Sequence, residues 1–415
     1  MTNELRMVTC IPLFLFCILI SANAHGYEYP QGVNAYSDYQ VRHSDLSARV
    51  STQFLQWGTM EYGEQTRTYA YYVPNTLPDE PVPLVFTLHG GTESALTVWI
   101  RDEGQTWKDL ADEHGFILIL PEGRPDPSDS NNHHWNDCRS AITNPDLDTR
   151  EDDVGLIVKL IDWAFANFHI DLDRVYANGA SNGGFMSYRL GIEARDRFAA
   201  IAAIIASFPD PTECAPPPWP LPVLIMNGTA DPWMPYEGGC ILPPMCDRGD
   251  ALSTDETVAA WVTLNEADRM PTVEELPDVV LDDSSTVTVF RYIHGIHDSE
   301  VMLYRVNNGG HTIPGPDPFP PSLVKIFGNK NRDISGPEEI WEFFSRHVRF
   351  RKGDVTDDGQ IDVTDAIRVV NIILEIDPPP TDFELWAADC NTDGTIDILD
   401  ILGIIGVILK IGTCP

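Results

Sequence analysis

The fold predicted for this chain depends on one run, Arg174-Val175-Tyr176-Ala177-Asn178-Gly179-Ala180-Ser181-Asn182-Gly183. Its first four residues predict a strand, and the run Phe185–Leu190 just after it predicts a helix. A serine between glycines at such a strand-to-helix turn projects from the end of the strand, where the helix N-terminus stabilises negative charge. Ser181 is therefore a candidate nucleophile. The alternative is a glycine turn without chemistry.

Outward from this run, β-rich segments alternate with helical patterns between residues 51 and 348. Strands are predicted at Leu84–Leu88, Phe116–Leu120, Arg174–Ala177, Ala200–Ile205, Pro222–Met226 and Met302–Arg305. Helices are predicted at Asp153–Phe168, Asn182–Ile192, Glu256–Asn265 and Pro337–His347. This alternation predicts an α/β fold, with a mainly parallel sheet covered by helices on both faces. Segments 54–62 and 66–73 predict an antiparallel hairpin, and the Tyr-rich residues 25–50 predict an irregular extension.

A serine nucleophile needs a base, and the base needs an acid that orients it. Asp231 follows a buried-looking strand in Asn227-Gly228-Thr229-Ala230-Asp231-Pro232, and His311 follows another in Asn308-Gly309-Gly310-His311-Thr312. Their order along the chain, Ser then Asp then His, is that of the α/β-hydrolases. The alternatives are an aspartate that caps a turn before Pro232 and a structural loop histidine.

The loop His89-Gly90-Gly91-Thr92 directly follows the apolar strand Leu84–Leu88. Its glycines expose backbone N–H groups, so Gly91 and Asn182, the residue after Ser181, are the predicted oxyanion donors. His89 is interpreted as a structural imidazole that holds this loop. Trp135, in a long loop, either stacks on a sugar or phenolic ring of the substrate or packs at the rim of the cleft.

These motifs resemble those of polyhydroxybutyrate depolymerase-type and feruloyl esterases, which are α/β-hydrolases. The resemblance spans residues 60–348 and rests on the runs Val175–Met186, Asn227–Gly239 and Gly309–Gly315. It departs at Ile313, where the family usually has Trp, and this leaves the acyl or leaving-group pocket open. It implies acyl transfer by Ser181, Asp231 and His311 through an acyl-enzyme, without a catalytic cofactor.

The N-terminal residues predict a secretory signal. Met7–Ile20 is an uncharged, mostly apolar run after Arg6, and Ala22-Asn23-Ala24 fits cleavage after residue 24. A run of this length is too short for a membrane anchor.

Cys10 and Cys17 would leave with the signal, and an even number of cysteines in an exported chain indicates disulfides. Proximity favours the pairs Cys240–Cys246 and Cys390–Cys414, which leaves Cys138–Cys214 as a guess.

Two segments 35 residues apart in the tail, 354–365 and 389–400, have the spacing of calcium-binding loops. Gly359 and Gly394 stand at the sharp sixth position, and Asp replaces the usual Glu at the twelfth. The predicted Ca²⁺ ligands are Asp354, Thr356, Asp358, Gln360 and Asp365 in the first loop, and Asp389, Asn391, Asp393, Thr395 and Asp400 in the second. The second loop is expected to bind more tightly, because Thr356 is a weaker ligand than Asn391.

The tail is therefore expected to bind two calcium ions and to be a small all-α domain. Helices are expected after the loops, at Ala366–Ile376 and Ile401–Ile411, and none before either loop. The duplication resembles a type I dockerin, which implies a cohesin-bearing scaffold as partner. The apolar pairs Val363-Thr364 and Ile398-Leu399 suit either an atypical cohesin or packing against the chain's own catalytic domain.

Charge excludes some partners. The 415 residues hold 63 Asp and Glu against 27 Lys and Arg, a net charge of −36, which argues against nucleic acids and anionic membranes.

The predicted organisation is a signal (1–24), an esterase domain (25–351) and a dockerin-like domain (352–415). We expect a secreted serine esterase that removes feruloyl or acetyl groups from xylan. The alternatives are a polyhydroxyalkanoate depolymerase and a non-catalytic carbohydrate-binding adaptor.

Overall fold

The computed structural model describes residues 55–125, 132–140, 142, 150–215, 220–376 and 378–414. The predicted signal peptide and the irregular extension at 25–50 lie outside these residues. Among the described residues, no helix is long and apolar enough to cross a membrane.

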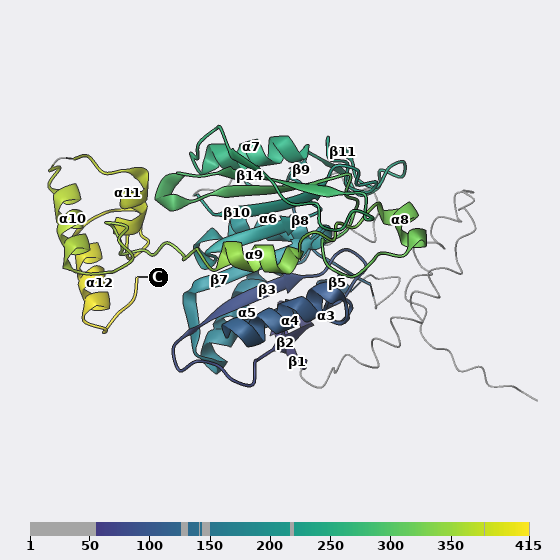
Figure 1. Ribbon diagram of the computed structural model, residues 1–415. Helices are drawn as coiled ribbons and strands as arrows, with labels where there is room; N and C mark the ends of the chain where they lie inside the picture. The colour runs from purple at the N-terminus through teal and green to yellow at the C-terminus, as the bar shows by residue number, and fades with distance from the viewer. Residues whose placement is uncertain are drawn as a thin grey trace, which may run out of the picture. The chain divides into compact units, whose positions relative to one another are not determined.

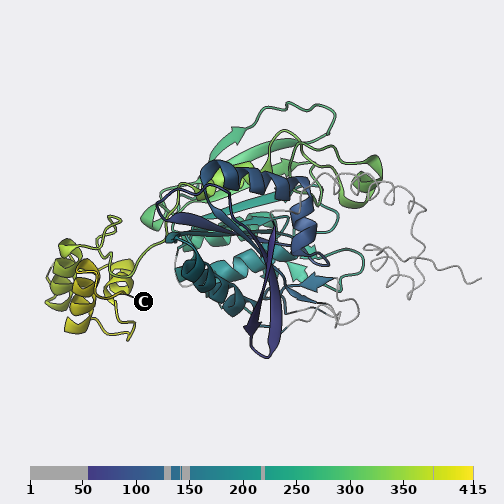
Figure 2. The same cartoon turned by 90° about the horizontal axis from the view of Figure 1, so that it is seen from below.

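A ten-stranded sheet forms the centre of the fold, in the order β1-β2-β4-β3-β7-β8-β10-β15-β14-β13 (Figure 1). The strands from β4 to β15 in this order are parallel, and the strands on both sides are antiparallel. Figure 2 shows the β1–β2 hairpin, in purple, reaching past the helices. The strand bounds are β1 Gln56–Tyr62, β2 Gln65–Tyr72, β3 Val82–Leu88, β4 Ile117–Pro121, β7 Ile170–Ala180, β8 Ala200–Ile204, β10 Val223–Gly228, β13 Thr272–Glu275, β14 Thr286–Tyr292 and β15 Val301–Asn307.

Helices cover both faces of the sheet, and each face has its own apolar core. Helices α5 (Asp153–Asn167), α6 (Asn182–Glu193) and α7 (Thr254–Leu264) pack on one face. Helices α3 (Ala95–Ile100), α4 (Asp102–His114) and α9 (Gly336–Phe344) pack on the other. Side chains of one strand alternate between the two cores, as a pleated strand requires. These findings confirm the predicted α/β class.

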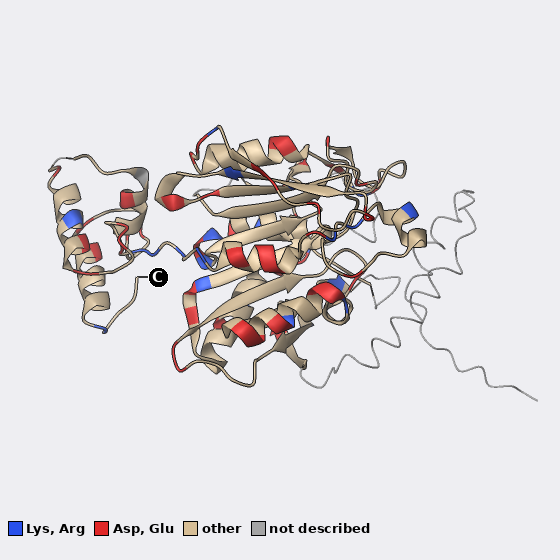
Figure 3. Cartoon of the chain, in the orientation of Figure 1, with Lys and Arg blue, Asp and Glu red and all other residues tan. Residues whose placement is uncertain are grey.

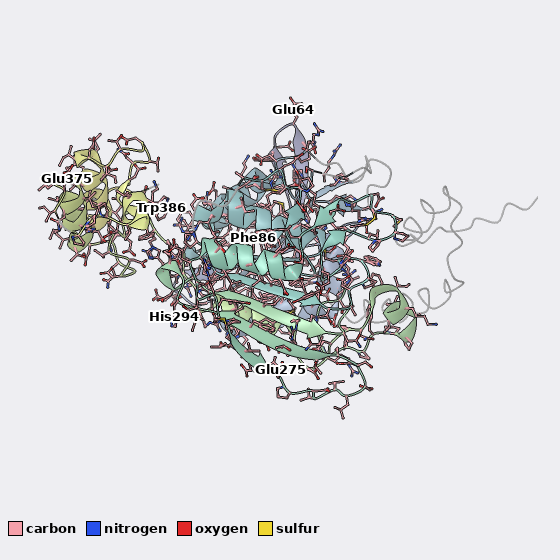
Figure 4. All side chains as sticks on the ribbon, turned by 90° about the horizontal axis from the view of Figure 1, so that it is seen from above. Glu64, Phe86, Glu275, His294, Glu375 and Trp386 are labelled. Atoms are coloured by element: carbon pink, nitrogen blue, oxygen red, sulfur yellow. A yellow bond between two sulfur atoms is a disulfide. The ribbon has the colours of Figure 1, made fainter. Side chains whose placement is uncertain are left out.

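The interior strands are buried along their whole length, which explains why they read as continuous apolar runs. Phe86 of β3 lies in the middle of the fold, whereas Glu64 lies at the tip of the β1–β2 hairpin and Glu275 at the β13 edge (Figure 4). The sequence prediction did not include the α3–α4 pair or the antiparallel strands β13 and β14. Helix α4 ends at Gly115, whose left-handed backbone (φ 70°) suits glycine.

Several short strands and helices lie in the loops between the main elements. They are β5 Arg124–Pro125, β6 His133–His134, η2 Arg195–Arg197, β9 Pro209–Asp210, β11 Gly239–Cys240, β12 Asp250–Ala251, η3 Ile296–Asp298 and α8 Pro321–Phe327. Strands β11, β12 and β9 form a small separate sheet.

The tail has its own apolar cluster and three helices, α10 (Val363–Ile373), α11 (Asp382–Ala388) and α12 (Ile398–Ile408). The expectation that no helix precedes either loop is wrong for the second loop, because α11 ends directly before Asp389. Thr381 caps this helix in a capping box with Glu384, and Phe383 and Ala387 are buried. A helix of seven residues has too few turns to show a clear apolar period in the sequence. Acidic residues lie along the tail and on the outer helices α4 and α9 (Figure 3).

Candidate active site

Ser181 lies at the turn between β7 and α6, in the position that the sequence predicts. Its φ of 54° and ψ of −119° are unusual for a residue with a side chain, so this backbone is strained. Gly183 is needed beside it, because a Cβ there would lie 2.3 Å from the carbonyl oxygen of Leu88. The turn therefore packs directly against the end of β3, where the predicted oxyanion loop begins.

Asp231 and His311 are in contact. His311 Nδ1 lies 2.7 Å from Asp231 Oδ2, and both side chains are almost fully buried. The other carboxylate oxygen, Oδ1, accepts the backbone N–H groups of Trp233 and Met234 at 2.7 and 2.8 Å. The carboxylate is thus held by its own turn, and it accepts the Nδ1 hydrogen of the imidazole.

The topology brings the three candidate residues to one edge of the sheet. Ser181 follows β7, Asp231 follows β10 and His311 follows β15, and these strands are parallel. The acid and histidine loops contact each other, since Ala230 N–H donates to the Gly309 carbonyl at 2.9 Å. This is the carboxyl edge of the sheet, where α/β folds place their ligands.

The loop after β3 is held by two side chains. His89 accepts the Gly123 N–H through Nε2 at 3.0 Å, so its Nδ1, 2.7 Å from the Gly90 carbonyl, carries the hydrogen. Burial lowers the pKa of His89 to about 4, which keeps the imidazole neutral. Glu93 accepts the Gly90 N–H at 3.0 Å and pairs with Arg101. These contacts support the structural reading of His89.

Two backbone N–H groups in this region are candidate oxyanion donors. The N–H of Gly91 has no hydrogen-bond partner among the described residues. Asn182 is the first residue of α6, so its N–H is one of the helix's unpaired donors. A Cβ placed on Gly91 would lie 3.6 Å from the Asn182 Cβ, so the two residues are close neighbours.

The Asn182 side chain is anchored away from this point. Its Oδ1 accepts the Trp135 N–H at 2.8 Å, and its Nδ2 donates to the Trp135 carbonyl and to Asp137. Asp137 in turn pairs with Arg139, whose Nη2 lies 2.8 Å from the carboxylate. This chain of contacts holds the start of α6 against residues 135–139.

The structure contradicts substrate stacking by Trp135. Its indole is 1% exposed, lies 4.7 Å from the His89 ring between centroids, and donates to the His89 carbonyl at 2.9 Å. The side chain is enclosed because it packs against the loop after β3, so no face remains for a substrate ring. Sequence alone gives only a tryptophan in a polar loop, which suits either position.

Sequence reasoning missed an aromatic residue beside the imidazole. Trp233, half-buried, lies two residues after Asp231, and its ring centroid is 5.2 Å from that of His311. Phe327 packs on Trp233 at 4.6 Å, and Phe319 packs on Phe327 at 6.0 Å. The Asp-Pro-Trp sequence at 231–233 is the one signal that could have indicated it.

Disulfides brace the loops around this edge. The structure joins Cys138 to Cys214, Cys240 to Cys246 and Cys390 to Cys414, with Cα–Cα distances of 5.4, 5.2 and 4.7 Å. The first joins the segment after Trp135 to the segment after β9, the second closes a short loop after Trp233, and the third lies within the tail.

The two tail loops have matching geometry. Asp354 accepts the N–H groups of Asp358 and Gly359, and Asp389 accepts those of Asp393 and Gly394. Both glycines have φ of 79°. The last ligand candidates, Asp365 and Asp400, are fully buried and also cap the helices that follow.

An oxygen-binding cation fits this arrangement. Burial, together with Asp365, raises the pKa of Asp354 to about 6, so the loop gathers carboxylates that lack a positive charge among them. The donors are all oxygens of carboxylates, hydroxyls and amides, as Ca²⁺ prefers. Gln360 and Thr395 stand at the seventh position, where the backbone carbonyl is the usual ligand.

Comparison with known proteins gives matches for both parts of the chain. The family described as "Esterase PHB depolymerase" matches residues 67–207, and the "Dockerin type I domain" family matches residues 352–409. NocK of Nocardia uniformis subsp. tsuyamanensis, a protein named as an esterase, is 30% identical over 297 residues, which covers 67% of this chain and 79% of NocK.

Two further relatives match the catalytic part. A protein named as acetylxylan esterase A, from Aspergillus fumigatus, is 27% identical over 38% of this chain and 39% of its own length. Feruloyl esterase B from Neurospora crassa is 32% identical over 36% of this chain and 47% of its own length. This chain thus belongs to the polyhydroxybutyrate depolymerase-type esterases of the α/β-hydrolase fold, is a carboxylic ester hydrolase, and ends in a type I dockerin domain.

Proposed function

We propose that the chain hydrolyses esters through a Ser181–His311–Asp231 triad. The observation that carries this proposal is the buried His311–Asp231 hydrogen bond at the sheet edge where the strained Ser181 turn ends. Because Nδ1 of His311 is engaged by Asp231, Nε2 is available to take the hydroxyl proton of Ser181. Ser181 then attacks the ester carbonyl, and the N–H groups of Gly91 and Asn182 stabilise the oxyanion. His311 protonates the leaving alcohol, and water hydrolyses the acyl-enzyme.

Hydrolysis of p-nitrophenyl acetate by Ser181→Ala tests this mechanism. We expect kcat to fall at least about 10⁴-fold, because the acyl-enzyme cannot form. Ser345→Ala, which removes a hydroxyl exposed beyond α9, should leave kcat unchanged. Thermal unfolding of both variants verifies that they fold. Full activity of Ser181→Ala would refute the assignment.

The preferred substrates are feruloyl or acetyl esters of plant cell-wall xylan. The dockerin domain supports this choice, and two relatives carry the names of acetylxylan and feruloyl esterases. With Trp135 enclosed, Trp233 is the aromatic residue that could contact a sugar or phenolic ring beside His311. A polyhydroxyalkanoate polyester is the second candidate, supported by the family that matches residues 67–207.

Parallel assays on methyl ferulate, acetylated xylan and polyhydroxybutyrate separate these candidates. Turnover of the polysaccharide or ferulate ester supports the preferred class, and turnover of the polyester alone supports the second. Absence of turnover on every ester, including p-nitrophenyl acetate, would favour a carbohydrate-binding adaptor.

The dockerin domain is proposed to bind two calcium ions and to attach a secreted enzyme to a cohesin-bearing scaffold. Exposed apolar residues repeat between α10 and α12 at the spacing of the two loops: Val363 with Ile398, Ile367 with Leu402, and Leu374 with Leu409. A repeated apolar face of this kind supports binding to a partner protein.

Secretion is supported by the predicted signal at residues 1–24 and by the disulfides. The proposed boundary between the two domains remains near residue 351.

A further inference from the structure

The charged side chain of Arg248 lies beside the predicted oxyanion hole. Nη1 of Arg248 and Nδ1 of His134 would both lie 3.5 Å from a Cβ placed on Gly91. The Asn182 Cβ would lie 3.6 Å from the same point. Four residues from distant parts of the sequence thus enclose one small region next to the two oxyanion donors.

Arg248 is the weakly compensated cation of this group: burial and Arg139 lower the pKa of its guanidinium, and the neighbouring Asp247 opposes this only in part. The structure gives its guanidinium no ion pair with a described carboxylate, and its Nε is buried without a hydrogen-bond partner. Arg139, by contrast, is paired with Asp137. Burial, with a contribution from Arg248, lowers the pKa of His134 to about 3, so that imidazole is neutral. A buried charge normally has a partner, because an unpaired one is unfavourable.

The chain holds Arg248 firmly at this place. It lies two residues after the loop that the Cys240–Cys246 disulfide closes, and its carbonyl accepts a hydrogen bond from Arg139 Nη1 at 3.0 Å. A β-bridge joins it to Ile142, and β12 begins two residues later at Asp250. The guanidinium is therefore presented by a braced loop.

The position indicates the ligand. Arg248 approaches Gly91 from the side where a side chain would project, and so lies beside the backbone donors. It can reach a substituent of the substrate next to the ester carbonyl. A guanidinium matches a carboxylate with two parallel hydrogen bonds. In a chain with a net charge of −36, a bound anion needs such a local cation.

We propose that Arg248 binds a carboxylate carried by the ester substrate, so that the enzyme prefers acidic esters, such as uronate-bearing saccharides or half-esters of dicarboxylic acids. The inference rests on the proposed esterase function and names a substrate class for the same site.

Two matched substrate pairs test the proposal. 4-Nitrophenyl hemisuccinate and 4-nitrophenyl butyrate differ in an acyl-side carboxylate, and acetyl esters of methyl glucuronide and methyl glucoside differ in an alcohol-side carboxylate. In at least one pair, Arg248→Gln should lower kcat/KM for the acidic ester by about 10- to 100-fold and for the neutral ester by less than about threefold. Arg248→Lys should retain part of the preference, because it keeps the charge but loses the paired geometry.

Arg197→Gln is the control. It removes the same charge from Arg197, which pairs with Asp162 on the surface just before β8, at the opposite edge of the sheet. The kcat/KM values for the acidic and the neutral esters should both stay unchanged. Equal losses on acidic and neutral esters, or no preference in the wild type, would overturn the proposal.

Calorimetry separates this inference from the triad assignment. Ser181→Ala should still bind succinate or glucuronate, and the Ser181→Ala, Arg248→Gln double variant should bind neither. Equal binding by the two variants would overturn the inference even if the triad is correct. Normal hydrolysis of neutral esters by Arg248→Gln would leave the proposed function intact.

Discussion

Asp231 Oδ2 accepts a hydrogen bond from His311 Nδ1 at 2.7 Å, and the remaining oxygen of the carboxylate accepts two N–H groups from its own turn. The carboxylate therefore has little freedom to rotate away from the imidazole. Its orientation comes from residues 231–234, whereas the imidazole comes from a loop 80 residues further along the chain. The two loops meet because β10 and β15 are neighbours.

Asp231→Asn should lower kcat about 10⁴-fold, because the amide cannot stabilise the charged imidazole and favours the wrong tautomer. KM should change little, since Asp231 does not reach the substrate. The measurement is steady-state kinetics on p-nitrophenyl acetate. Asp268→Asn is a matched control, because Asp268 contacts His294 at 2.8 Å on the exposed surface. Similar losses in both variants would contradict a specific role for Asp231.

Asn182→Ala should lower kcat by about tenfold or more, with KM nearly unchanged. The substitution retains the backbone N–H but removes the side-chain anchors to Trp135 and Asp137 that hold the start of α6. Asn167→Ala, which removes an exposed amide at the end of α5, should have no effect. A rise in KM at constant kcat would instead indicate that the Asn182 side chain contacts the substrate.

Glu103 makes stability depend on pH. Burial, with the neighbouring Asp102, raises the pKa of Glu103 from 4.5 to about 8. Between these values the folded state keeps a proton that the unfolded state releases, so the free energy of unfolding falls as pH rises from about 4.5 to 8.

Glu103→Gln imitates the protonated group and should remove this dependence. Its Tm should exceed that of the wild type at pH 8 by several degrees, at about 2–4 °C for each kcal/mol, and should differ little at pH 5. Glu113→Gln, on the exposed side of the same helix α4, is the control. A Tm difference that is the same at both pH values would contradict the raised pKa.

The features predictable from the sequence are those that a local pattern determines. The interior strands are buried on both sides and so are apolar throughout, and the Ser181 turn needs glycines close to it. Strand β13 escaped prediction because all four of its residues are exposed and two of them are glutamates. Helix α4 escaped because only Gly104, Trp107, Leu110 and Ala111 of its 13 residues are buried.

Contacts between distant loops were beyond prediction. The burial of Trp135 depends on the His89 carbonyl, 46 residues away. Arg248 reaches Gly91 through a loop whose path follows from a disulfide and a small sheet. Neither relation leaves a periodic trace in the sequence, because periodicity reports on the burial of one element and not on which loops meet.

The two tail loops should bind calcium with unequal affinity, and the third loop position should account for the difference. Asn391 supplies an amide oxygen there, whereas Thr356 supplies a hydroxyl that lies 3.0 Å from Asp365 Oδ1. The hydroxyl is the weaker ligand, and its contact with Asp365 competes with a bound ion. Calorimetric titration of the calcium-depleted full chain should therefore resolve a tighter and a weaker site.

A reciprocal exchange tests the cause. Thr356→Asn should strengthen the weaker site and Asn391→Thr should weaken the tighter one, each by a measurable shift in Kd, while hydrolysis of p-nitrophenyl acetate stays unchanged. Thr392→Asn is the control, because it makes the same change at an exposed fourth position that is not a proposed ligand. Unchanged affinities in both exchanged variants would mean that the third position does not determine the difference. In that case the cause would lie at a position where both loops have the same residue but pack it differently. The first position is an example, because burial raises the pKa of Asp354 there to about 6.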